Sequence, residues 1–66
     1  MQIVLNSKEE IVEKTISLLD FLQTKGLNPE TVIVEYNGTI LKKDEWNSVI
    51  LQNNDRLEVL KFVGGG

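Results

Sequence analysis

The side chains that usually carry out chemistry in small proteins are scarce in this sequence. Its 66 residues include no cysteine and no histidine, which removes thiol nucleophiles, imidazole bases and the usual zinc ligands. The group that remains is the carboxyl of Gly66, at the end of the segment 61–66 (KFVGGG). A terminal carboxyl is ionised near pH 7 in model peptides, and an ionised carboxylate is a poor electrophile. Chemistry at Gly66 therefore requires this carboxyl to be activated first.

Three glycines precede this carboxyl and form the end of the chain. Glycine has the most backbone freedom to lose on ordering, and chain ends that are not tied down are usually mobile. We therefore predict a folded domain over residues 1–61 and a flexible glycine tail over residues 62–66. When extended, this tail reaches roughly 16–18 Å, and it is thin enough to enter a channel that excludes any residue with a Cβ. On the glycines alone, a frayed end or an expression scar is the simpler interpretation.

Length and composition argue against several classes of function. A single domain of 66 residues leaves little room for a small-molecule pocket, so we do not expect a self-contained enzyme, a bound cofactor or a metal site. Seven basic residues against ten acidic ones give a net charge of −3, which is unfavourable for binding nucleic acid. No apolar run approaches the length of a membrane span, and no signal peptide is evident. We expect a soluble cytoplasmic protein.

The N-terminal half predicts two strands followed by a helix. Residues 2–6 and residues 9–13 are the strands, joined by a polar turn. The helix lies within residues 15–25 and begins at Ser17, whose hydroxyl caps an orphan backbone N–H. Gly26 is the expected left-handed residue at the end of this helix.

The C-terminal half predicts three more strands. Residues 31–36 are β-branched almost throughout, which favours a central and well-buried strand. Asn37-Gly38 is a strong hairpin signal, because both positions of a type I′ turn need a positive φ, and residues 39–41 form the returning strand. Residues 56–62 alternate between apolar and polar side chains and form the last strand.

The segment between the last two strands contains the single tryptophan of the chain. We predict that Trp46 is at least partly buried and anchors the core, since an isolated tryptophan is more often a packing residue than a ligand platform. Asp44 is the expected cap of a single helical turn that contains Trp46.

The order of these elements predicts an α+β fold. Two hairpins flank one helix, and the helix covers one face of a mixed sheet of about five strands. The first and last strands pair with each other in parallel, because the hairpin and helix between them supply the long crossover that a parallel pair needs. This is the β-grasp, or ubiquitin-like, arrangement.

The sequence resembles the ThiS family of small sulfur carrier proteins of thiamin biosynthesis, over nearly its whole length. The resemblance departs from the family at Asn6-Ser7, where Asn-Gly is frequent, and at Asn54, where glycine is frequent. It rests on these segments: Met1-Gln2-Ile3, Thr15-Ile16, Leu18-Leu19, Val34-Glu35-Tyr36-Asn37-Gly38, Trp46, Asp55 and Phe62-Val63-Gly64-Gly65-Gly66.

The resemblance implies a carrier that is a cosubstrate of partner enzymes. An E1-like, ThiF-like enzyme uses ATP to adenylate the carboxyl of Gly66, and a cysteine desulfurase relay supplies the sulfur that replaces AMP. The resulting thiocarboxylate donates sulfur to a ThiG-like thiazole synthase. Gly64 and Gly65 then thread the end into partner active sites. The apolar docking patch at the base of the tail comprises Leu60, Phe62 and Val63.

Two alternatives remain open at the level of the sequence. One is a sulfur carrier of another pathway, similar to the small subunit of molybdopterin synthase. The other is a ubiquitin-like binding module or a modifier that is joined to lysines of other proteins. A modifier forms conjugates of higher mass, whereas a plain binding module is not modified at all.

Overall fold

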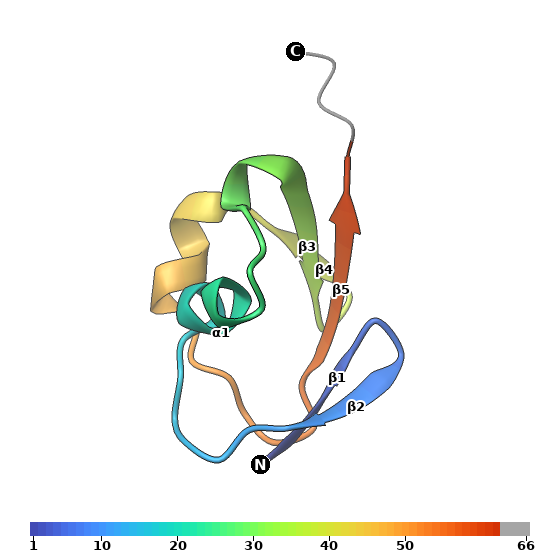
Figure 1. The fold of residues 1–66 in the computed structure, drawn as a ribbon, viewed down its shortest axis with the longest axis vertical. Coiled ribbons are helices and arrows are strands. Elements are labelled where there is room, and N and C mark those ends of the chain that lie inside the picture. Colours follow the sequence, from blue (N-terminus) through green and yellow to red (C-terminus); the bar gives the residue numbers. More distant parts are fainter. Residues whose placement is uncertain (63–66) are drawn as a thin grey trace.

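The computed structural model describes residues 1–62, which form a five-stranded mixed sheet with one α-helix. The strand order is β2-β1-β5-β3-β4, so the last strand of the chain lies in the middle of the sheet. β1 and β5 are parallel and the other neighbours are antiparallel, as the sequence predicted. The elements, in chain order, are β1 (Gln2–Leu5), β2 (Lys8–Ile11), α1 (Leu18–Thr24), η1 (Pro29–Thr31), β3 (Val32–Tyr36), β4 (Thr39–Leu41), η2 (Lys43–Ser48) and β5 (Arg56–Lys61) (Figure 1).

The first hairpin has a tight two-residue turn despite its lack of glycine. Asn6 and Ser7 both adopt a positive φ, of 49° and 68°, which is the backbone conformation that Asn-Gly adopts in a type I′ turn. The turn ends at Ser7, so β2 begins at Lys8, opposite Leu5. The sequence-based prediction of residues 9–13 therefore placed this strand too late along the chain.

The helix has the caps that the sequence predicted. The Ser17 hydroxyl oxygen accepts a hydrogen bond from the backbone N–H of Asp20 at 3.0 Å. At the other end Gly26 has a φ of +72°, and the N–H of Leu27 reaches back to the carbonyl of Leu22 at 3.2 Å. This is a Schellman termination, which satisfies carbonyls left free at the helix end. The buried residues of α1 are Leu18, Phe21 and Leu22, which pack against the sheet.

Trp46 lies in η2 and is almost completely buried, with 1% of its surface exposed. Its Nε1–H donates to the carbonyl of Leu41 at 3.3 Å. The predicted role of Trp46 is confirmed, but the predicted cap is wrong. The turn already begins at Lys43, so Asp44 lies inside it. Instead the Glu45 carboxylate accepts from the backbone N–H of Lys42 at 2.8 Å, because a carboxylate three residues along reaches the orphan donor at the start of a turn.

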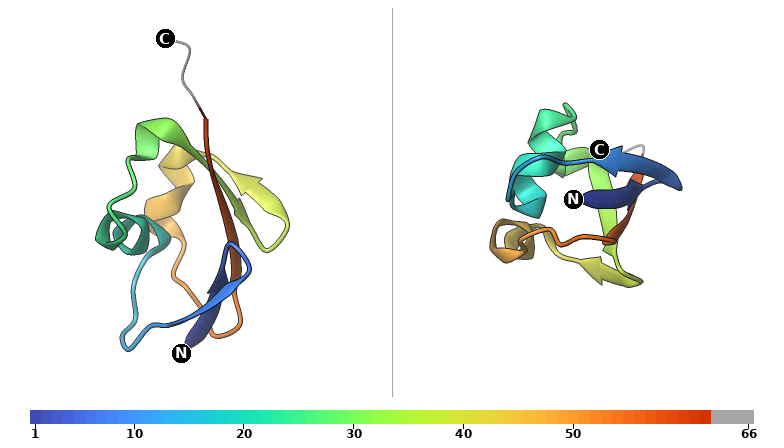
Figure 2. Two further views of the ribbon diagram at one scale, coloured as in Figure 1. Left: turned by 45° about the vertical axis from the view of Figure 1, so that its right-hand side comes forward. Right: turned by 90° about the horizontal axis from the view of Figure 1, so that it is seen from below.

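The core lies between the sheet and the layer formed by α1 and η2 (Figure 2). Within residues 1–62, no element covers the opposite face of the sheet, which we call the open face. No helix in the described part of the chain is both long enough and apolar enough to span a bilayer. The buried apolar residues are Ile3, Val12, Leu18, Phe21, Leu22, Val32, Val34, Trp46, Leu51, Leu57 and Val59.

Candidate functional site

The C-terminal end of β5 lies at the end of the described structure opposite the N-terminus (Figure 1). Leu57 and Val59 point into the core, whereas Leu60 and Phe62 are 61% and 44% exposed. The backbone N–H of Phe62 donates to the carbonyl of Thr31 at 3.0 Å, so the sheet still holds the chain one residue after β5 ends. Two predicted docking residues, Leu60 and Phe62, are therefore exposed beside the start of the tail.

The remaining predicted site residues lie outside the described residues. These are Val63 in the docking patch, Gly64 and Gly65 in the threading segment, and Gly66 as the modified residue. The predicted domain boundary between residues 1–61 and residues 62–66 also stays a prediction.

Leu60 has apolar neighbours on the open face that were not predicted from the sequence. Ile33 of β3 is the direct cross-strand neighbour of Leu60, and it is 42% exposed. Ile40 of β4 lies opposite Glu35 and is also exposed. The exposure of Ile33 could have been predicted from the alternation of side chains along β3, because Ile33 lies between the buried residues Val32 and Val34. A strand covered on only one face exposes every second side chain.

Two like charges face each other within this apolar surface. Glu35 of β3 and Glu58 of β5 are direct cross-strand partners, and like charges in this position are destabilising. The two ion pairs found among residues 1–62 join other groups, Lys25 with Glu10 and Lys43 with Glu30. The open face therefore combines exposed aliphatic side chains with a negatively charged centre.

A hydrogen-bond network around Asp55 fixes the start of β5. The Asp55 carboxylate is 6% exposed and accepts from the Tyr36 hydroxyl at 2.9 Å, the Asn37 amide at 3.0 Å and the backbone N–H of Gln52 at 2.7 Å. The Asn37 side-chain oxygen accepts from the N–H of Arg56 at 2.8 Å. Burial raises the pKa of Tyr36, and the hydrogen bond to Asp55 and its negative charge raise it further. This network joins the central hairpin to the last strand.

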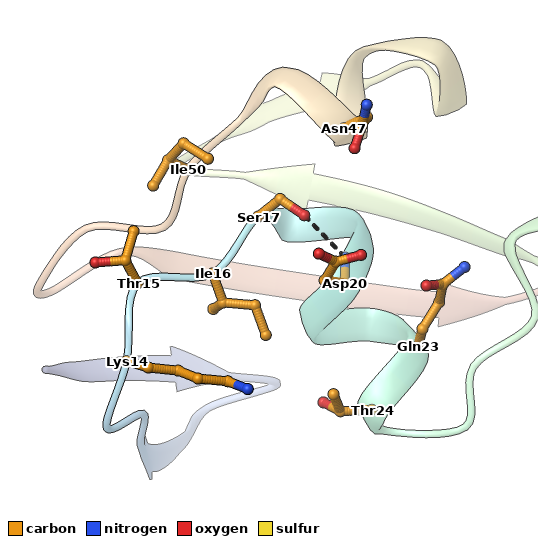
Figure 3. Close-up of a pocket in the computed structure, with 9 residues that line it drawn as sticks. All are labelled: Lys14, Thr15, Ile16, Ser17, Asp20, Gln23, Thr24, Asn47 and Ile50. Carbon is orange, nitrogen blue, oxygen red and sulfur yellow. Dashed lines mark hydrogen bonds between the residues drawn. The ribbon is translucent and has the colours of Figure 1, made fainter.

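One surface pocket in the described structure lies beside the start of α1, away from the end of β5. It has a volume of about 630 Å³, which is within the range of small-molecule sites. Figure 3 shows that the Ser17 hydroxyl at its edge is already engaged by Asp20 in the helix cap. Residues 1–62 contain no cluster of acidic, histidine or cysteine side chains suited to a metal ion. The pocket is lined by Lys14, Thr15, Ile16, Ser17, Asp20, Gln23, Thr24, Asn47 and Ile50.

Comparison with known proteins identifies the family. The sequence matches the ThiS family over residues 1–66. The chain belongs to the ThiS family. The fold agrees with this assignment, since the crystal structure of the thiamine biosynthesis protein ThiS from Geobacter metallireducens superposes with a TM-score of 0.85 at 28% identity, covering 100% of both chains. The predicted β-grasp fold is therefore confirmed.

Individual proteins with known names are also similar to this chain. The sulfur carrier protein ThiS of Bacillus subtilis is 38% identical over 63 residues, which cover 94% of this chain and 96% of the relative. The thiazole synthase of Magnetococcus marinus is 36% identical over all 66 residues, but the chain spans only 20% of its length. Membership of the ThiS family confirms the prediction of a small sulfur carrier protein that is not itself an enzyme.

Proposed function

We propose that this protein carries sulfur for thiamin biosynthesis as a thiocarboxylate on Gly66. The match to the ThiS family over the whole of residues 1–66 is the observation that carries this proposal. It is supported by the position of β5, which leads from the core to an exposed Phe62, two residues before the first of the three glycines. The absence of cysteine leaves the terminal carboxyl as the group on which sulfur is carried.

Activation and sulfur transfer are two separate displacements at Gly66. A carboxylate oxygen attacks the α-phosphorus of ATP on a ThiF-like adenylating enzyme, and pyrophosphate leaves. The acyl adenylate is electrophilic at the carbonyl carbon, where the terminal sulfur of a persulfide on a cysteine desulfurase relay displaces AMP. A thiol then cleaves the S–S bond of the resulting acyl disulfide, which leaves the thiocarboxylate on Gly66 and the relay cysteine in a new disulfide with that thiol. In both steps the carrier supplies the reacting end and the partners supply the catalytic groups.

The residues before Gly66 position it in its partners. Gly64 and Gly65 have no Cβ, so the end fits a narrow channel while the folded domain stays outside. Leu60, Phe62 and Val63 dock the base of the tail on each partner. The exposure of Leu60 and Phe62 supports this role, because exposed apolar side chains next to one another are typical of docking surfaces.

The acceptor of the sulfur is proposed to be a ThiG-like thiazole synthase. Two thiazole synthases, from Magnetococcus marinus and Paramagnetospirillum magneticum, contain a segment similar to the whole of this chain. This arrangement supports a functional connection between the carrier domain and thiazole synthesis. It favours thiamin biosynthesis over the molybdopterin alternative.

The proposal is tested by intact mass spectrometry of the protein after incubation with a ThiF-like enzyme, ATP, a cysteine desulfurase and cysteine. The wild-type protein gains the mass of one sulfur in place of one oxygen, and this gain requires ATP. A variant that lacks Gly66 serves as the matched control, since deletion shortens the reach of the end by about 3.3–3.6 Å.

Thiolation of the Gly66 deletion at the wild-type rate contradicts the proposal. Conjugates of higher mass in extracts of cells that produce the tagged protein support the modifier alternative instead. The wild type and the Gly66 deletion are also compared by thermal unfolding. We expect the same melting temperature for both, because the deleted residue is terminal.

A further inference from the structure

The two halves of β5 differ in the number of strands that pair with them. β3 pairs with β5 from Leu57 to Lys61. β1 pairs only with Arg56 and Leu57, after which the chain turns away at Asn6 and Ser7. One edge of β5 beyond Leu57 is therefore not paired with any strand of residues 1–62 (Figure 1).

The register of the sheet shows which backbone groups lie along this edge. The N–H of Phe62 donates to Thr31, and the carbonyl of Arg56 accepts from Asn37, so the even-numbered residues of β5 direct their backbone groups towards β3. In an antiparallel pair the intervening residues direct theirs to the other side. The backbone groups of Val59 and Lys61 therefore point to the unpaired edge.

Asn6 occupies the first position along this edge. Its backbone N–H donates to the carbonyl of Leu57 at 2.9 Å, and its side-chain oxygen accepts from the N–H of Val59 at 2.7 Å. Asn6 is therefore the last residue of this segment that forms hydrogen bonds with β5. The carbonyl of Val59 and both backbone groups of Lys61 come next, immediately before Phe62, and residues 1–62 contain no strand that pairs with them.

We infer that this edge of β5, from Val59 to Lys61, accepts an extended segment of the adenylating enzyme as an additional strand. The inference rests on the proposed function, in which this enzyme is the first to bind the unmodified end. Main-chain pairing along a sheet edge supplies affinity and direction in many peptide complexes. Here the added strand holds the chain immediately before the tail, so that it guides Gly66 towards ATP.

The side chains beside the edge define the chemistry of the incoming segment. Leu60 and Phe62 lie on the open face, so the segment presents apolar side chains there. Lys61 lies on the opposite side and is exposed, so the segment carries an acidic side chain next to it. A lysine on an edge strand also discourages pairing between copies of the same chain, which favours a partner of complementary charge over self-association.

The other edges of the sheet are less suited to this role. The outer strand β2 has charged residues at three of its four positions, Lys8, Glu9 and Glu10, and charged edges resist strand pairing. The outer strand β4 has only three residues. Neither strand leads directly into the tail, whereas the free edge of β5 ends at Phe62.

Amide hydrogen exchange measured by NMR tests this pairing directly. The Lys61 N–H is expected to exchange freely in the isolated protein and at least about tenfold more slowly when a saturating adenylating enzyme is present. The N–H groups of Leu60 and Phe62 face β3 and serve as internal controls that are protected in both states. Unchanged exchange at Lys61 in the complex overturns the inference, as does protection that rises with carrier concentration alone, which indicates a second copy.

Variants of Lys61 provide a kinetic test on the full-length protein. Lys61→Pro removes the outward-facing N–H together with the side-chain charge and is tolerated in an edge position, whereas Lys61→Ala removes the charge but keeps the N–H and so controls for the loss of charge. We expect Lys61→Pro to lower kcat/KM for ATP-dependent adenylation by about tenfold or more, with a smaller decrease for Lys61→Ala. Unfolding midpoints near that of the wild type show that both variants are folded.

The outcomes separate the inference from the proposed function. Wild-type protein that is not adenylated on Gly66 contradicts the proposed function. If the wild type is adenylated and Lys61→Pro is adenylated equally fast, only the inference fails. A defect of Lys61→Pro that appears only in sulfur transfer to thiazole synthase also overturns it, because the added strand then belongs to that enzyme.

Discussion

Both faces of the sheet carry aliphatic side chains, but these side chains have different environments on the two faces. Val34 and Leu57 lie beneath α1 and η2 and are buried, whereas Ile33 and Leu60, only a few residues away on the same strands, are exposed on the open face. Burial of an aliphatic side chain stabilises the fold by about 1.5–3 kcal/mol. The covered face therefore provides stability, and the open face leaves apolar side chains exposed, which the proposed function assigns in part to partner docking.

Replacement of Trp46 by alanine is expected to have the largest effect on stability. Trp46 is the largest fully buried side chain of the covered face, and truncation of such a residue costs about 3–5 kcal/mol. Urea unfolding followed by circular dichroism measures this change. A loss well below 1 kcal/mol would show that Trp46 does not support the core and would weaken the contrast between the faces.

A matched pair of leucines in β5 tests the contrast within one strand. Leu57→Ala is expected to cost about 2–5 kcal/mol because Leu57 is buried in the core. Leu60→Ala should change stability by only about 0.5 kcal/mol, as is usual for exposed positions, yet lower the rate of adenylation. Equal destabilisation by both substitutions, measured by the same urea unfolding, would contradict the division of roles between the faces.

Asp55→Asn, at the start of β5, is expected to have an intermediate effect on the free energy of unfolding. The substitution preserves shape but replaces one acceptor oxygen with an N–H₂ group, so a donor that now binds Asp55 loses its partner. An orphaned buried donor costs about 1–3 kcal/mol. The free energy of unfolding and the chemical shifts of the Tyr36 and Asn37 amides report this loss. Unchanged values for both would show that the network does not hold β5 in place.

Tyr36→Phe is expected to have the smallest effect on the free energy of unfolding, and the size of this effect depends on pH. The pKa of Tyr36 is raised in the fold by burial and by Asp55, so the folded state retains this proton at a pH where the unfolded chain releases it. Its contribution to stability is present below about pH 10, the ordinary tyrosine pKa, and is lost as the pH rises through the folded-state value.

The measurement for Tyr36 compares urea unfolding of the wild type and Tyr36→Phe from about pH 8 to about pH 11. At the lower pH the variant should lose about 0.5–1.5 kcal/mol through the missing hydrogen bond. This deficit should shrink at the upper end because only the wild type loses a tyrosine proton. A constant deficit across the range would show that Tyr36 titration is not linked to folding.

The sequence predicted local structure well where the signal comes from adjacent residues. The caps at Ser17 and Gly26 and the turn at Asn37-Gly38 depend on conformational preferences and hydrogen bonds within a few residues. The prediction for Asp44 failed because the turn has its N-cap at Lys42, two residues earlier, and the orphan N–H of Lys42 is bound from inside the turn by the Glu45 carboxylate. The docking patch that includes Leu60 and Phe62 came from the family resemblance, and the exposure of both residues in the structure is consistent with it.

Other features depend on residues that are distant in the sequence. The sequence alone determined the order of the five strands and α1 and the parallel pairing of the first and last strands; the glycine tail with Gly66 as its reactive end stays a prediction. Only the tertiary structure decided that α1 covers the face opposite Ile33 and Ile40, that Asp55 receives hydrogen bonds from the central hairpin, and that β5 has a free edge beyond Leu57. The alternation in β3 is a local signal that Ile33 lies on the other face from Val32 and Val34. Which face α1 covers and where β1 stops beside β5 depend on long-range contacts, which no local sequence pattern specifies.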